Sequence, residues 1–219
     1  MSDAAVRGLA GRVSRLPLPA PAIPPDLVLR LQKYRDLGRV PPVVREAAQV
    51  AAADASGLVE PAAVVWRGSV TAVDPGGLVT LDQVHCFHSR TLARLLAEST
   101  EAYVFVMTLG PALEARTQRL LEEKLYVEAV LLDTAAWAAI ELLRQALKRC
   151  LAAEARARGH VLTARLGPGH GDWAVDEQPR LLGIFDDVPL PVTVNEFACM
   201  LPRKSVSGLF GAAPIQGRG

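Results

Sequence analysis

The sequence predicts an α+β fold, a single domain with a mostly antiparallel sheet and packed helices. Residues 126–158 carry apolar side chains at helical spacing without Gly or Pro, which predicts one long helix. Short valine-rich segments are separated by turn residues, as at 74–77, where DPGG follows one such segment and precedes another. Helices and strands come in clusters, without a repeat period or a regular βαβ alternation.

The bulk composition excludes several classes of protein. The chain has 219 residues, 50% apolar residues and a formal net charge of +1, so no basic excess points to nucleic acid. Three widely spaced cysteines fit a reducing cytoplasm better than a disulfide framework. We expect no signal peptide, and residues 129–143 are too short and too charged to span a bilayer. These features predict a cytoplasmic protein with no nucleic-acid or membrane partner.

Residues 1–25 are expected to form a flexible tail and residues 26–219 the domain, because five prolines punctuate the first segment and little of it looks buriable. Turn and capping residues then delimit the helices. We expect helices over 26–38, 42–56 closed by Gly57, 90–98 capped by Ser89, the segment after Pro111, 126–158 closed by Gly159, and a short helix capped by Asp176.

Alternating or continuous apolar runs predict the strands. The strand segments are 62–73 and 78–81 as a hairpin, 102–110 as a buried strand, 160–166, and 191–201 paired with 204–210.

Two segments of the last third resemble a known family. RLGPGHGDWAVDEQ begins at Arg165, and LPRKSVSGLFG spans 201–211. Together they resemble the activation domain of vitamin B12-dependent methionine synthase, which carries an arginine ahead of Pro-Gly-Tyr and later a Ser-Val-Ser-Gly segment. VFVMTLGPALE at 104–114 and YRDLG at 34–38 look like members of the family that occur as separate proteins. The resemblance therefore covers the chain from about residue 26 to its end.

The resemblance implies a curved, mostly antiparallel sheet with a shallow site for S-adenosylmethionine. It also implies docking on a cobalamin-binding protein, where an electron from a flavodoxin- or ferredoxin-type donor and a methyl group from S-adenosylmethionine restore methylcobalamin from cob(II)alamin. This chain has no Asp-x-His-x-x-Gly cobalamin motif. The implied role is therefore an activation subunit that works on a separate corrinoid protein.

Arg165 is suited to the ligand's carboxylate, since its planar fork makes charge-assisted hydrogen bonds. Gly167 and Gly169 leave main-chain groups uncovered, which an adenine or a carboxylate could approach. The alternative is a surface salt bridge beside a tight loop. Glu141, on the long helix, could hold the ligand's ammonium group, or could simply pair with Arg144 or Gln145 along the helix.

His170 stands where the family has tyrosine, and it keeps a ring beside the ligand that titrates near neutral pH. Phe210 also replaces a tyrosine. Lys204, Ser205 and Ser207 alternate along a strand, so that they and Phe210 are further candidates to line the site. A solvated edge strand explains the same alternation.

Three further features leave alternatives open. Trp173 could anchor a partner or pack in the core. The lost tyrosines fit a docking module that binds a corrinoid protein without S-adenosylmethionine. HCFH at 85–88 would suit an unrelated hydrolase or metalloprotein, but the sequence supplies no clear further ligands, so no metal is expected. No catalytic residue is expected, since methyl transfer of this kind needs no general base.

Overall fold

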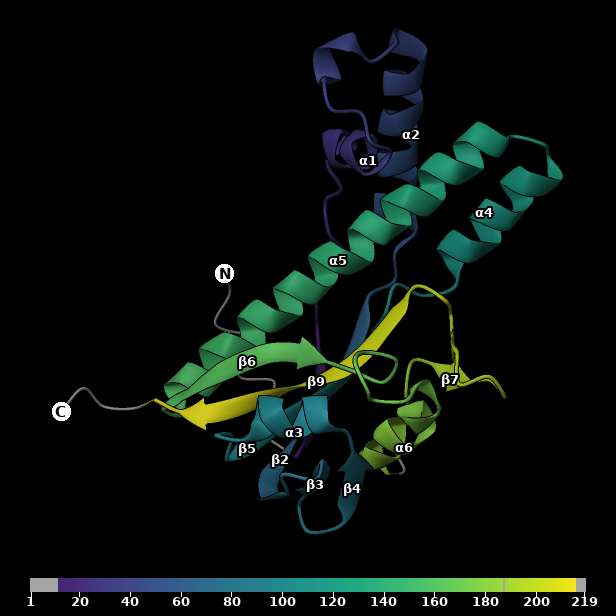
Figure 1. The fold of residues 1–219 in the computed structure, drawn as a ribbon. Helices are drawn as coiled ribbons and strands as arrows, with labels where there is room; N and C mark the ends of the chain where they lie inside the picture. The colour runs from purple at the N-terminus through teal and green to yellow at the C-terminus, as the bar shows by residue number, and fades with distance from the viewer. Residues whose placement is uncertain (1–11, 187, 216–219) are drawn as a thin grey trace.

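The central strand β5 (Glu101–Thr108) is buried on both faces, and the other elements are arranged around it. A computed structural model describes residues 12–186 and 188–215 (Figure 1). Along β5, Tyr103, Phe105 and Met107 face one hydrophobic cluster, while Ala102 and Val104 face a second cluster on the other side of the sheet. The sheet is therefore the middle layer between two sets of helices.

The main sheet has seven strands, and every pairing in it is antiparallel. Its order is β4-β3-β2-β5-β9-β6, and β1 pairs with the first half of β2. The bounds are β1 Val13–Leu16, β2 Ala62–Val73, β3 Leu78–Leu81, β4 His85–His88, β6 His160–Leu166 and β9 Ser205–Pro214. Register shifts in β2 and in β6 mark irregularities of the kind that bend a sheet.

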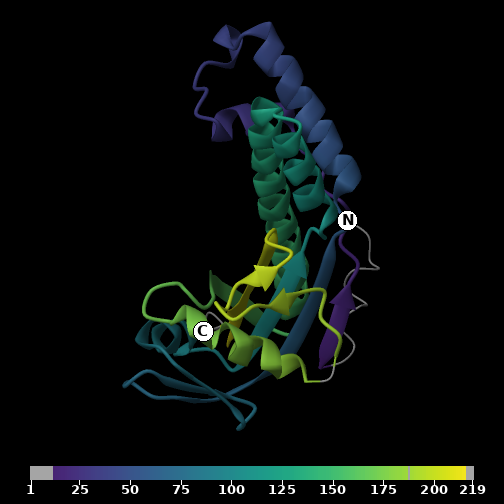
Figure 2. The ribbon, with the colours of Figure 1, turned by 90° about the vertical axis from the view of Figure 1, so that its right-hand side faces the viewer.

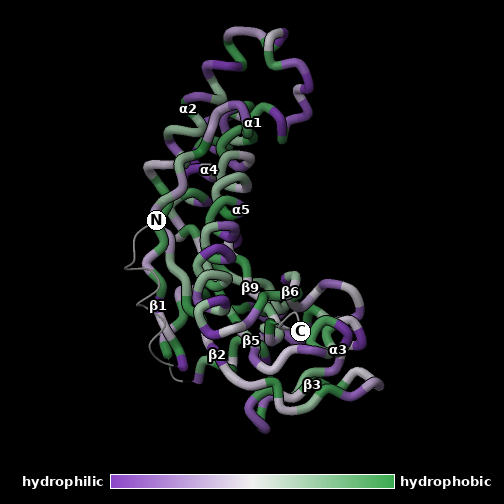
Figure 3. Tube along the Cα trace, turned by 90° about the vertical axis from the view of Figure 1, so that its left-hand side faces the viewer, coloured by the Kyte–Doolittle hydropathy of each residue, from purple (hydrophilic) through white to green (hydrophobic). Residues whose placement is uncertain are grey.

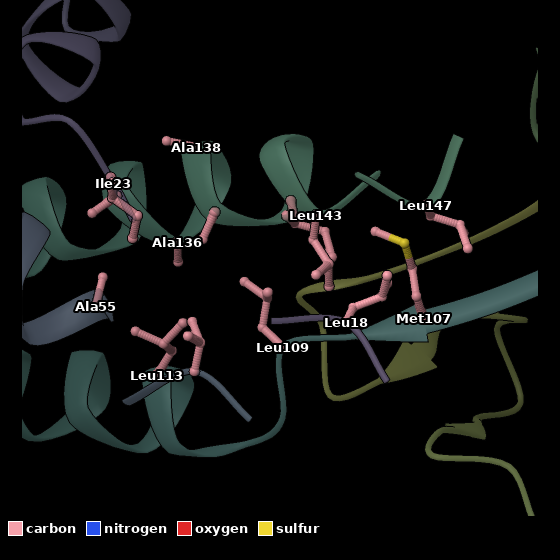
Figure 4. Packing of buried hydrophobic residues seen from close by; sticks show 14 of the residues in the cluster. Leu18, Ile23, Ala55, Met107, Leu109, Leu113, Ala136, Ala138, Leu143 and Leu147 are labelled. Carbon is pink, nitrogen blue, oxygen red and sulfur yellow. The ribbon is translucent and has the colours of Figure 1, made fainter. Parts of the chain in front are cut away.

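The long helix α5 (Tyr126–Ala157) crosses one face of the sheet, as the 126–158 periodicity predicts (Figure 1). It packs with α1 (Pro25–Leu31), α2 (Pro42–Leu58) and α4 (Ala112–Glu122). Alanines on the buried face of α5 keep these helices close, and Leu143 and Leu147 of α5 lie over Met107 of β5 (Figure 4). The helices extend beyond the sheet and give the molecule its bent outline (Figures 2 and 3).

The opposite face of the sheet is covered by shorter elements. These are α3 (Arg90–Leu96), α6 (Gln178–Leu182) and η4 (Gly183–Phe185), whose apolar side chains join the second cluster, and η3 (Val175–Glu177) directly precedes α6. Ser89 caps α3 as predicted, since its hydroxyl accepts a hydrogen bond from the Leu92 amide at 3.0 Å. Trp173 is buried here against Phe87, with ring centroids 5.5 Å apart, so it is a core residue and not an exposed anchor.

A buried polar cluster fixes the last turns of α5 to the sheet. Glu154 is buried and accepts a hydrogen bond from Arg67 of β2 at 2.7 Å and another from the hydroxyl of Tyr103 in β5. Burial and the Glu154 carboxylate together raise the pKa of Tyr103. Because a buried carboxylate is costly without partners, this cluster favours one position of α5 over the sheet.

The predicted flexible tail is wrong for the part of residues 1–25 that the structure describes. Its backbone is extended, but Val13–Leu16 forms β1 beside β2, and Leu16, Leu18 and Ile23 are buried in the core. The prolines keep the segment extended, while Leu18 and Ile23, each between two prolines, lie in the core under α5 (Figure 4). Residues 1–11 lie outside the described residues.

Several element boundaries also differ from the predictions. The first helix ends at Leu31 and not near Gly38, because Lys33 adopts a left-handed conformation (φ 69°) and the Tyr34 amide bonds back to the Leu29 carbonyl at 3.1 Å. Gly57 lies inside α2. Asp176 lies within η3, and no side-chain cap begins α6.

The predicted pairing of 191–201 with 204–210 is wrong. Within the first segment, β7 (Thr193–Val194) and β8 (Met200–Leu201) pair with each other. The second segment forms β9, which lies between β5 and β6. The turn explains the difference, because the Asn195 side chain accepts hydrogen bonds from the Phe197 and Cys199 amides and reverses the chain there.

The burial of Phe210 yields a stability prediction. Phe210 is fully buried and stacks on Phe105 with centroids 5.5 Å apart. Phe210→Ala should lower the free energy of unfolding by about 3–5 kcal/mol, since it leaves a cavity in the core. Phe197→Ala is the matched control, because Phe197 is 72% exposed, and its effect should stay within about 0.5 kcal/mol. Equal urea midpoints for Phe210→Ala and the wild type would contradict this placement.

Candidate functional site

Strand pairing places Arg165 on the α5 face of the sheet. Arg165 lies near the end of β6 and is paired with Phe210 of β9. Residues opposite one another in an antiparallel pair point to the same face, and Phe210 belongs to the hydrophobic cluster under α5. The Arg165 side chain therefore projects toward the helix that carries Glu141.

The Arg165 guanidinium is half-buried and held from two directions. Its Nη1 donates to the Ser207 carbonyl at 2.9 Å, and its Nη2 lies 3.1 Å from Nε2 of His170. Burial lowers the pKa of Arg165 and the neighbouring Arg144 lowers it further, while Glu141 opposes them. An arginine keeps its charge under such conditions, so the structure presents a fixed, partly desolvated cation.

The glycine segment after β6 forms a tight loop. Most glycines in and around it are required because a side chain there would collide with other parts of the protein. A side chain at Gly167 would lie 3.0 Å from the Ser207 carbonyl oxygen, and one at Gly208 would lie 2.5 Å from that of Leu166. Gly171 has φ 63°, and a side chain there would meet Thr91 of α3. These three positions allow β6, β9 and α3 to approach one another closely.

Gly169 is different, because only Val175, at 3.7 Å, lies close to where its side chain would be. Its φ of 85° requires glycine for conformation, and the space around it is open. The Gly169 amide donates to the Trp173 carbonyl at 2.7 Å, and the His170 amide donates to the Gly167 carbonyl at 3.2 Å. The loop is thus a closed turn that carries His170 beside Arg165.

Asp172, not predicted as a site residue, fastens this loop to the other side of the molecule. Its carboxylate accepts hydrogen bonds from the Ser89 hydroxyl at 2.6 Å, the Arg90 amide at 2.9 Å and the Thr91 amide at 3.0 Å. These bonds, led by that from Ser89, hold the pKa of Asp172 well below its usual range. A capping serine such as Ser89 was visible in the sequence, but nothing there indicated that a second acceptor would come from 83 residues away.

Glu141 faces the site from α5 but already has partners along the helix. Arg144 donates to both of its carboxylate oxygens, from Nε at 2.8 Å and from Nη2, and Gln145 donates at 3.3 Å. The hydrogen bond from Arg144 is the main cause that lowers the pKa of Glu141, and the charge of Arg165 acts in the same direction. The structure therefore contains the intrahelical pairing named as an alternative, and it also brings Glu141 within electrostatic reach of Arg165.

The side chains of the remaining candidates form no hydrogen bond with the Arg165 guanidinium. Lys204 bridges to Asp133 of α5, with Nζ–Oδ1 at 2.8 Å, and the Ser205 hydroxyl lies 2.8 Å from that of Thr108. Ser207 is buried and its hydroxyl donates to Gln178 at 2.9 Å, so its carbonyl and not its side chain serves the site. Phe210 is in the core, so the expectation that its ring lines the site is wrong.

The HCFH segment forms β4, which separates its histidines. Alternation along the strand points His85 and Phe87 to one face, and Cys86 and His88 to the other. His85 lies edge-on to Trp66, and Phe87 is buried. Among the described residues, no group of three or more His, Cys, Asp or Glu side chains could hold a metal ion. The same residues include no helix long and apolar enough to cross a membrane.

Comparisons with known proteins identify the fold. No protein-family model matches the sequence, and no curated protein matches it. Among solved structures, the chain is similar to the MetH reactivation domain bound to AdoHcy, with a TM-score of 0.65 and 14% sequence identity. The alignment covers 100% of this chain and 88% of that one. The α+β fold with one long helix is therefore that of a reactivation domain, as the sequence motifs predicted.

The anchoring of Asp172 yields a pH prediction. Because its pKa is lower in the folded state than the value of about 3.9 in an unfolded chain, the carboxylate stabilises the fold above that pH. This contribution is lost as the pH falls toward the folded-state pKa. Asp172→Asn should lower the urea midpoint at pH 7, and its difference from the wild type should shrink below about pH 4. A difference that stays constant down to pH 3, or that Asp54→Asn on α2 reproduces, would contradict the assignment.

Proposed function

We propose that this chain, on its reactivation-domain fold, binds S-adenosylmethionine and supports the reductive remethylation of cob(II)alamin on a separate corrinoid-dependent methionine synthase or methyltransferase. The observation that carries the proposal is the half-buried guanidinium of Arg165, held by Ser207 and His170, with the carboxylate of Glu141 within electrostatic reach. The AdoHcy bound by the structural neighbour supports the choice of ligand.

The amino-acid end of S-adenosylmethionine is a zwitterion, and the site offers one group for each of its charges. The carboxylate would be held by the outward-facing donors of Arg165, since Nη1 and Nη2 each keep a further N–H after binding Ser207 and His170. The ammonium would lie toward Glu141. Glu141 already pairs with Arg144, so its carboxylate would be shared between Arg144 and the ligand's ammonium, which would displace solvent there.

The glycine turn would hold the remainder of the ligand. Around Gly169 the backbone is open on one side, so a flat adenine or a ribose could approach its peptide groups. Asp172 would keep this turn in place through α3. The chain would thus position S-adenosylmethionine with its methyl group toward a docked corrinoid, whose chemistry, with one electron from a flavodoxin- or ferredoxin-type donor, accepts the methyl group and leaves S-adenosylhomocysteine.

Arg165→Ala should weaken the binding of S-adenosylmethionine on the order of 10- to 100-fold, the size of one lost charge-assisted hydrogen-bonding group. Isothermal titration calorimetry with S-adenosylmethionine and S-adenosylhomocysteine measures this. Arg149→Ala, at an exposed position of α5, is the matched control and should bind as the wild type does. A wild type that binds neither ligand would refute the proposal. If that chain still binds a corrinoid protein, it is a docking module without S-adenosylmethionine.

The assignment of Glu141 is tested with a truncated ligand. Glu141→Gln should weaken S-adenosylmethionine about tenfold, because the amide removes the charge opposite the ammonium. The same variant should leave the affinity for 5′-methylthioadenosine unchanged, since that nucleoside has no amino-acid end. Equal losses for both ligands would show that Glu141 acts through the structure of α5 and does not contact the ammonium.

A further inference from the structure

We propose that His170, in its neutral form, is a positioning residue that holds the Arg165 guanidinium ready for a carboxylate, so that protonation of His170 releases Arg165 and weakens carboxylate ligands. The inference rests on the proposed function for its ligand. The tautomer of the His170 imidazole beside Arg165 is inferred from contacts within the chain alone.

The contacts of His170 determine where its proton must be. An arginine Nη2 only donates hydrogen bonds, so Nε2 of His170, 3.1 Å away, must offer its lone pair. The neutral ring then carries its proton on Nδ1, which lies 3.2 Å from the Gly167 carbonyl and donates to it. Both ring nitrogens are therefore satisfied only by the neutral Nδ1–H tautomer.

This arrangement immobilises a side chain that would otherwise be mobile. Arg165 has one other fixed contact, from Nη1 to the Ser207 carbonyl at 2.9 Å. With that contact alone, the guanidinium could rotate toward the carboxylate of Glu141. The two charges already interact, since Arg165 helps to lower the pKa of Glu141. The second contact, from His170, fixes the plane of the fork before any ligand arrives. Such preorganisation spares the ligand the cost of ordering a long side chain.

Protonation of His170 would remove this contact. The imidazolium has N–H groups at both nitrogens, so Nε2 could no longer accept from Arg165. It would also add a positive charge next to Arg165, with Arg144 nearby on α5.

The acidic groups around the loop offer little compensation for that charge. Glu141 is bound to Arg144, the oxygens of Asp172 are bound at Ser89, Arg90 and Thr91, and Glu177 of η3 pairs with Arg180. Acidification should therefore displace Arg165 from its position.

The structural part is tested without any ligand. Nitrogen-15 NMR of the histidine side chains in the full chain at pH 8 should show His170 as the Nδ1–H tautomer. In Arg165→Ala that preference should weaken, because the partner of Nε2 is gone. A dominant Nε2–H tautomer in the wild type, or identical spectra in the two proteins, would overturn the assignment, whether or not S-adenosylmethionine binds.

The functional part is tested by calorimetry with S-adenosylmethionine at pH 7.2 and at a lower pH at which the same NMR spectra show His170 protonated. The wild type should lose about tenfold in affinity at the lower pH, the size of one hydrogen bond to a charged group. His170→Ala should bind weakly at both values. His170→Gln, whose amide oxygen can accept near the position of Nε2, should recover most of the affinity lost in His170→Ala and show little pH dependence.

His160→Gln is the matched control, since His160 lies at the far end of β6 beside Thr100, and it should keep the wild-type pH profile. Tighter binding by the wild type at the lower pH would mean that charged His170 contacts the carboxylate itself, which overturns the positioning role. An equal pH dependence in His170→Gln would do the same. Absence of binding at every pH would refute the proposed function, while the NMR result would still decide the state of His170.

Discussion

The burial of β5 on both faces is the constraint from which the rest of the structure follows. A strand without a solvent face needs a layer of helices on each side, which α5 with its neighbouring helices and α3 with α6 supply. Because β9 and β6 continue the sheet beside β5, the end of β6 emerges between these two layers. The loop that follows is therefore within reach of α5 through Arg165 and of α3 through Asp172.

The main role of the glycines at this loop is to allow neighbouring strands to pack closely. Gly167 and Gly208 allow β6 and β9 to close on each other, and this closeness lets the Ser207 carbonyl accept from Arg165. The cation of the site is thus held by a main-chain group that no side-chain substitution removes. His170, from the same loop, supplies the second contact to the guanidinium, through Nε2 of its imidazole.

Local signals in the sequence predicted most of the elements and the architecture. The period of α5, the cap at Ser89 and the apolar run of β5 each depend on nearby residues and are confirmed. The errors concern long-range packing. Pro-rich residues 12–25 looked unable to be buried, yet they lie against β2 and α5, and the partner of β9 depends on a turn at Asn195.

The same distinction applies to the site. Arg165, Gly169 and His170 are close in sequence and lie together in the structure, with Glu141 within electrostatic reach of Arg165, while their role in binding a ligand stays a prediction. Ser207 was placed by strand alternation and Phe210 by the resemblance, and neither could reveal that both faces of β9 are covered. Structure determination of a crystal of the chain with S-adenosylhomocysteine tests the central claim most directly. We expect the ligand's carboxylate on Arg165 and its ammonium toward Glu141. A ligand bound elsewhere, with Arg165 still held only by Ser207 and His170, would contradict it.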